Sequence, residues 1–290
     1  MTRFPHDQFA KQYLKELLSP LGEVETSRDI PGEVREVDVW LVPTSQPAAA
    51  RALGLLGRLA ANPCILEPFR NAVTPTEVRD CLLKLFELHG ELQRQSRRSD
   101  SRLSEEELPR LWILSPTASE SLLDGFRARL EEENWMRGVY FLGDSFRSAI
   151  VAIHQLPSTS DTLWLRILGK GTVQKQAIEE LTALPLGNPL RSNVLELLTN
   201  WRMNIERKTT LTSEDRELLE NLTPAYLEWR KEAVREGQRF VVENLLRFRF
   251  GELDEELSAI IKPVLELPPE EFTPLLMQLS REELLTRFGE

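Results

Sequence analysis

The clearest pattern of apolar and polar positions is an alternation with period two across residues 34–42. Aliphatic side chains occupy one set of alternate positions and acidic or aromatic ones the other set: Val37, Val39 and Leu41 against Glu36, Asp38 and Trp40. Because successive side chains of a strand point to opposite faces, this pattern predicts a β-strand with two unlike sides. Pro43 ends it, and an extended segment over residues 23–30 followed by Pro31-Gly32 predicts a hairpin leading into it.

Helical and strand patterns surround this hairpin. Apolar residues at helical spacing predict helices over residues 7–18 and 47–61. Another helix is expected to begin after Thr74, because Thr74, Pro75 and Glu77 match a capping box with proline at the first helical position, and to run to Leu92 before a polar loop. Short apolar runs predict further strands over residues 64–69, 111–114, 138–142 and 149–154. This mixed order predicts an α/β domain with one central sheet flanked by helices.

The pattern changes after residue 157. One last apolar stretch covers residues 163–168, and helical spacing then predicts helices over residues 173–184, 194–205 and 214–247. Two short helices are expected after Gly251, the last one capped by Ser280 with Glu283. Polar residues cluster near Thr209, so we place a boundary there, with an α/β domain over residues 1–208 and an all-α domain over residues 209–290.

Composition narrows the classes of protein that fit. Hydrophobic residues make up 41% of the chain and charged residues 28%, which is ordinary for a folded protein. The net charge of -10 and a pI of about 5.1 argue against a broadly basic nucleic-acid wrapper, but leave room for an enzyme with a local cleft. No run reaches the ~18 apolar residues of a membrane span. We expect a cytoplasmic protein without a membrane partner, in which Cys64 and Cys81 are small buried side chains.

Asp38 and Glu67 are the first candidates for chemistry, since each lies in a predicted strand. A magnesium-dependent phosphodiesterase needs carboxylates that converge on one hard cation, and Mg²⁺ prefers oxygen ligands and retains several waters. Acids on neighbouring strands can converge in this way, because the strands lie only ~4.8 Å apart. From spacing alone, any two acids on two strands would serve equally well.

The order of elements around these acids resembles the PD-(D/E)XK nuclease core. Several blocks are similar to the recombination-promoting (Rpn-type) nuclease and transposase-associated proteins: residues 4–11, with an Asp, an aromatic and a Lys; residues 35–41, around Asp38; and residues 163–171 continuing through 177–178. Residues 236–238 and 245–253, with an Arg-Phe-Gly signature, resemble a small helical domain of unknown function that commonly follows such cores in cyanobacterial proteins.

This resemblance implies a restriction-endonuclease-like mixed sheet flanked by helices and followed by an all-α C-terminal region. It implies that Asp38 and Glu67 hold Mg²⁺ or Mn²⁺, that Glu16 of the first helix adds a carboxylate, and that Lys11 and Arg70 contact nucleic acid. The family's Lys or Gln stands two residues after the Glu, where this chain has Phe69. Either a basic residue elsewhere in the chain, Lys84 or Arg70, supplies the positive charge, or the site is degenerate.

Two functions follow from these alternatives. The first is a metal-dependent DNA endonuclease in which Asp38, Glu67 and Lys84 are the catalytic residues. The second is an inactive module of the same fold that binds nucleic acid or protein and assembles through its helical tail. The resemblance makes DNA the expected partner and a homodimer the expected assembly.

Other motifs are weaker. Residues 169–172, Gly-Lys-Gly-Thr, lack the glycine placement of a phosphate-binding loop, and we expect a turn before a helix there. Basic residues at Arg94, Arg97, Arg98 and Arg102 favour a solvated loop, with backbone contacts to nucleic acid as the alternative.

Overall fold

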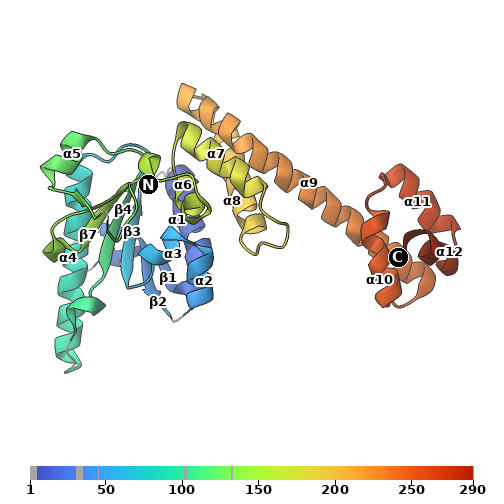
Figure 1. Cartoon of the computed structure of the whole chain (residues 1–290), viewed down its shortest axis with the longest axis horizontal. Helices are drawn as coiled ribbons and strands as arrows, with labels where there is room; N and C mark the ends of the chain where they lie inside the picture. The colour runs from blue at the N-terminus through green and yellow to red at the C-terminus, as the bar shows by residue number, and fades with distance from the viewer. Residues whose placement is uncertain (1–4, 31–34, 45, 101–102, 132, 290) are drawn as a thin grey trace. The chain divides into compact units, whose positions relative to one another are not determined.

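The computed structural model describes residues 5–30, 35–44, 46–100, 103–131 and 133–289 (Figure 1). The chain divides into two compact units, Met1–Tyr226 and Leu227–Glu290. The division falls inside a single helix, α9 (Ser213–Phe250), rather than at the polar cluster near Thr209. The first unit therefore includes the opening turns of α9.

A mixed seven-stranded sheet forms the centre of the first unit. Its order is β1-β2-β3-β4-β7-β6-β5. The strands are β1 (Gly22–Ile30), β2 (Arg35–Pro43), β3 (Cys64–Pro68), β4 (Arg110–Ser115), β5 (Arg129–Leu130), β6 (Val139–Phe141) and β7 (Ser148–Ala152). The pairs β3–β4 and β4–β7 are parallel and the other pairs antiparallel. The predicted α/β class with one central sheet is confirmed.

The alternating segment forms β2, which pairs antiparallel with β1. The predicted turn at Pro31-Gly32 lies outside the described residues. Val37, Val39 and Leu41 are fully buried, as expected for the aliphatic side of the strand. Trp40, on the other side, is also buried, because helices cover both faces of this part of the sheet.

Helix α4 (Pro75–Arg98) covers one face of the sheet and begins with the predicted capping box at Thr74. Its inner side meets a core that includes Trp40, Ile65 and Ile113. The helix extends to Arg98, so Arg94, Arg97 and Arg98 are helical and the predicted loop was wrong for them. Arg102 lies outside the described residues.

Helix α1 (Pro5–Leu18) contacts β1, β2 and β3 and packs against α8 (Arg191–Glu206). Phe9 of α1 stacks on Trp201 of α8 with ring centroids 4.3 Å apart. The remaining helices of this unit are α5 (Glu120–Gly125), α6 (Leu163–Arg166) and α7 (Gly171–Thr182). Short 3-10 segments occur at Ser19–Leu21, Glu105–Glu107, Asp144–Phe146, Ile153–Gln155 and Ser160–Thr162.

The helix predicted over residues 47–61 is two helices, α2 (Pro47–Ala52) and α3 (Leu55–Leu59). They are separated at Gly54, whose φ of +54° is a left-handed conformation that glycine adopts readily. A Cβ at this position would lie 2.4 Å from the backbone oxygen of Asp161. The break therefore comes from a close backbone approach by a segment distant in sequence.

The second unit has its own apolar core, formed by the end of α9 with α10 (Glu255–Val264), α11 (Pro269–Gln278) and α12 (Arg281–Phe288). Three short helices follow Gly251 where two were predicted. Pro263 lies inside α10 and Pro274 inside α11. Across the described residues, no helix is both long and apolar enough to cross a membrane.

Candidate functional site

Asp38 and Glu67 lie side by side where β2 and β3 separate. The backbone pairing of these strands ends at Val39 with Leu66. At the next position, the Asp38 backbone N–H donates to Glu67 Oε1 at 3.2 Å. Glu67 is only 1% exposed, whereas the Asp38 side chain is 18% exposed. The pair therefore consists of a buried and a partly exposed carboxylate at the point where the two strands separate.

Lys84 of α4 completes this cluster. Its Nζ donates to Glu67 Oε2 at 2.7 Å. The helix presents Lys84 to the sheet because it lies three residues after Cys81 and next to Leu85, both of which are buried in the core under α4. Phe69, which occupies the position expected for the cation, packs against the same core. Among the sequence candidates for the displaced cation, Lys84 is the one in contact with the acidic pair.

Burial and the nearby charge of Asp38 raise the pKa of Glu67 above its ordinary value, while Lys84 acts in the opposite direction. Burial alone would lower the pKa of Lys84, but the charge of Glu67 and the hydrogen bond to it raise that pKa overall. The two side chains therefore depend on each other for their charged forms. Such mutual dependence is typical of a buried ion pair and also of active sites.

Lys11 of α1 forms a second ion pair at the site. Its Nζ lies 2.8 Å from Asp38 Oδ1 and 3.4 Å from Asp7 Oδ2. Burial acts to lower the pKa of Lys11, but its contacts with Asp38 and Asp7 raise it overall. Each carboxylate of the acidic pair thus has a lysine of its own, Asp38 with Lys11 and Glu67 with Lys84.

A cavity of about 630 Å³ opens beside Asp38; we call it the Asp38 cleft. It is lined by residues of α1, β2, the end of β3 and the segment after it, α4, α8, the α8–α9 connection and the start of α9. These residues are His6, Asp7, Asp38, Pro68, Phe69, Arg70, Asn71, Glu77, Trp201, Ile205, Lys208, Thr212, Glu214, Asp215 and Leu218. All of these residues belong to the first unit. Sequence patterns did not indicate the contributions of α8 and α9, because the residues are far apart in the chain.

Arg70 is the cleft residue best suited to bind an anion. Its guanidinium lies over the Trp201 ring, 5.6 Å from the ring centroid, and its Nη1 is buried without a hydrogen-bond partner. Burial lowers the pKa of Arg70, and the acids Glu214, Glu217 and Asp215 act to raise it. A guanidinium stays charged at neutral pH, so this unsatisfied donor is suited to a phosphate or a carboxylate.

Glu16 is not brought to the acidic pair. It follows Lys11 by five residues, which is about 140° around a helix. Asn193 of α8 donates a hydrogen bond to Glu16 Oε1. Glu16 therefore helps to join α1 to α8.

The donor chemistry of Asp38 and Glu67 fits a hard divalent cation. Mg²⁺ is commonly bound through one or two carboxylates and completes its shell with waters and substrate phosphates. Within the described part of the chain, no group of three or more His, Cys, Asp or Glu side chains is arranged to hold a metal ion. From the described residues, Asp38 and Glu67 are therefore the carboxylates that an ion there could use, and such an ion would take Asp38 away from Lys11.

The other sequence candidates have structural roles. Residues 169 and 170 directly precede α7, which begins at Gly171, as expected for a turn before a helix. Lys170 Nζ donates to Asn71 Oδ1 at 3.0 Å and to Glu214 Oε1 at 3.1 Å. Cys64 and Cys81 are buried, as predicted.

Comparison with protein-family models, with curated proteins and with solved structures gives no match.

Proposed function

We propose that this chain is a metal-dependent phosphodiesterase with a restriction-endonuclease-like PD-(D/E)XK core that cleaves DNA. The observation that carries the proposal is the contact between Lys84 and Glu67 at 2.7 Å, beside Asp38. The sequence lacks the expected cation at Phe69, and Lys84 reaches the same carboxylate from α4. Two acids and a lysine from three different elements therefore converge, as this chemistry requires.

Each residue has a role in the proposed reaction. Asp38 and Glu67 would hold Mg²⁺ or Mn²⁺, which when bound lowers the pKa of a water and offsets charge on the phosphate. Lys84 lowers the pKa of the buried Glu67 and so favours its ionised form. Lys11, once released from Asp38, and Arg70, with its unsatisfied Nη1, would bind phosphate oxygens in the Asp38 cleft.

The second candidate function is binding without cleavage. The observation that favours it is that both carboxylates already have ammonium partners, Lys11 at 2.8 Å and Lys84 at 2.7 Å. In that case the ion pairs stabilise the fold, and the Asp38 cleft binds nucleic acid or protein through Arg70.

A plasmid-nicking assay with Mg²⁺, Mn²⁺ or EDTA tests the first proposal. We expect metal-dependent nicking by the wild type, and Asp38→Ala and Lys84→Met to lower its rate by about 100-fold or more. Lys15→Met and Lys175→Met are matched controls, because neither lysine lines the Asp38 cleft. Absence of metal-dependent nicking by folded wild-type protein would overturn the enzymatic proposal. DNA binding in EDTA, weakened by Arg70→Gln, would then support the second candidate.

A further inference from the structure

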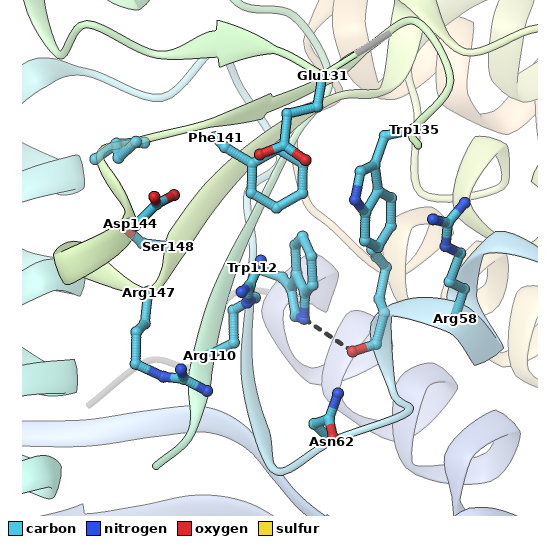
Figure 2. A pocket seen from close by; sticks show the side chains of 12 residues that line it. Arg58, Asn62, Arg110, Trp112, Glu131, Trp135, Phe141, Asp144, Arg147 and Ser148 are labelled. Atoms are coloured by element: carbon cyan, nitrogen blue, oxygen red, sulfur yellow. Dashed lines mark hydrogen bonds between the residues drawn. The ribbon is translucent and has the colours of Figure 1, made fainter. Parts of the chain in front are cut away.

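A second cavity lies at the beginning of β4, on the first unit, and shares no lining residue with the Asp38 cleft. Its volume is about 280 Å³, close to the lower end of ligand pockets at roughly 300 Å³. Figure 2 shows the residues around it, which we call the arginine cavity: Arg58, Leu59, Asn62, Arg110, Trp112, Glu131, Trp135, Phe141, Leu142, Asp144, Arg147 and Ser148.

Three aromatic rings form an apolar wall of the arginine cavity. Trp135 lies 5.5 Å from Trp112 and 5.2 Å from Phe141, measured between ring centroids. Trp112 is fixed by its Nε1, which donates to the Leu59 backbone oxygen at 2.9 Å (Figure 2). The wall is therefore a rigid surface that can accept the carbon part of a ligand.

The guanidinium groups of Arg58 and Arg110 lie against these aromatic rings and, among the described residues, are not paired with carboxylates. Arg58 lies 3.9 Å from the Trp135 ring centroid, and Arg110 lies 5.5 Å and 5.3 Å from those of Trp112 and Phe141 (Figure 2). In the described part of the chain, no carboxylate lies within the 4.0 Å of an ion pair from Arg58, Arg110 or Arg147. A guanidinium stacked on a ring keeps its N–H edge available for an anion.

Arg147 adds two further observations. Its backbone is left-handed, with φ of +46°, a conformation that a residue other than glycine adopts only at a cost. Its Nη2 donates to the Leu108 backbone oxygen at 2.8 Å, whereas its Nε is buried without a partner. Ser148 also lines the cavity, and its Oγ is likewise buried without a partner.

The cavity has an excess of positive charge. Burial and the nearby charge of Arg147 lower the pKa of Arg110, and Glu131 and Asp144 offset this only in part. Both of these acids are exposed. An anion among the guanidinium groups would relieve their repulsion, and a phosphate has enough oxygens to accept from several of them at once.

From these observations we infer that the arginine cavity binds a small organic phosphate, with the phosphate at Arg110 and Arg147 and the carbon part against the aromatic wall. This site is independent of the proposed cleavage. A free nucleotide and the phosphorylated end of a nucleic-acid strand share this chemistry.

Calorimetric titration of the full chain tests the inference with inorganic phosphate, adenosine 5′-monophosphate and adenosine as probes. We expect adenosine 5′-monophosphate to bind at least tenfold more tightly than inorganic phosphate, and adenosine to bind at least tenfold more weakly than its monophosphate. A 5′-phosphorylated oligonucleotide distinguishes a strand end from a free nucleotide. The inference is overturned if neither phosphate compound binds, or if adenosine binds as tightly as its monophosphate.

Variants locate the binding site. Arg110→Gln and Arg147→Asn should each weaken binding of adenosine 5′-monophosphate at least tenfold; Asn is chosen because it tolerates the left-handed backbone. Arg79→Gln, at an exposed position of α4, is the matched control for loss of charge. Asp38→Ala should leave this binding unchanged, which separates the inference from the proposed nuclease. Unchanged binding in a folded Arg110→Gln variant would refute the assignment to this cavity.

Discussion

At the scale of single residues, the buried position of Glu67 governs the candidate site. A buried carboxylate is costly unless it is paired and hydrogen-bonded, and here the Asp38 N–H and Lys84 Nζ satisfy its two oxygens. Sequence patterns placed Asp38 and Glu67 in strands that the structure contains, but spacing alone did not distinguish them from other acids on strands. They could not choose between Arg70 and Lys84, since that choice depends on how α4 packs on the sheet.

Removal of Lys84 should destabilise the fold in a pH-dependent way. Lys84→Met leaves Glu67 buried without its cation, which we expect to cost about 2–4 kcal/mol at pH 9, where the wild-type carboxyl is ionised and paired. At pH 6 the cost should be smaller, because burial raises the pKa of Glu67 and the unpaired carboxyl is then protonated. Urea unfolding in EDTA at both pH values measures this difference. An equal loss at the two pH values would contradict the account of the ion pair.

His6 should make the protein sensitive to acid. Its Nε2 is buried without a partner, and burial, followed by the charges of Arg70 and Lys170, lowers the pKa of His6 to about 3. The folded state then binds a proton less readily than the unfolded state, so stability is lost as the pH falls from about 6.5 towards 3.

We expect this loss to be about 3 kcal/mol between pH 7 and pH 4. A His6→Gln variant, which cannot be protonated there, should show a loss smaller by that amount. The measurement is the free energy of unfolding in urea across this pH range. Parallel curves for the wild type and the variant would refute the role given to His6.

At the scale of elements, sequence patterns predicted features that depend on neighbouring residues and missed features that depend on residues distant in the chain. The start of α4 was predictable because Thr74 and Glu77 satisfy each other within one turn. Its end was not, because polar turns continue the helix to Arg98 without an apolar pattern. The break between α2 and α3 depends on Asp161, more than a hundred residues away from Gly54 in the sequence.

Glycine substitutions test this account of the α2–α3 break. Gly54→Ala should destabilise the protein by about 2 kcal/mol or more, because alanine is strained at positive φ and its Cβ would meet the Asp161 backbone. Gly125→Ala is the matched control: nothing lies within 4 Å of its Cβ, and its place in α5 predicts a gain of about 0.5 kcal/mol. Thermal unfolding compares the two, and a similar effect of both substitutions would contradict the close approach.

At the scale of the whole molecule, each unit has its own core. The second unit buries a cluster that includes Leu246, Ile260, Phe272 and Leu284. A helical C-terminal region was predictable from apolar spacing and capping residues. The place of the division was not, because α9 continues through it without a break in its helical pattern.

We expect residues 227–290 to fold without the rest of the chain. A separate hydrophobic core is the usual requirement for independent folding. A fragment of these residues should show a helical circular dichroism spectrum and a cooperative thermal transition. Leu246→Ala, which opens a void in the core, should lower its midpoint, whereas Leu227→Ala, at an exposed position, should leave it nearly unchanged. A broad transition without cooperativity would show that this core needs the first unit.

The two ion pairs that Lys11 and Lys84 form with Asp38 and Glu67 also affect how readily a cation can bind to these carboxylates. The charges of Asp38 and Glu67 cancel those of Lys11 and Lys84 when all four groups are ionised, so these two ion pairs exert little attraction at a distance. A divalent ion must exchange with an ammonium group that is already in place, and such exchange lowers its apparent affinity. Occupancy should therefore reach its midpoint at a higher metal concentration than at an unpaired pair of carboxylates, with ammonium release and metal entry as one coupled event.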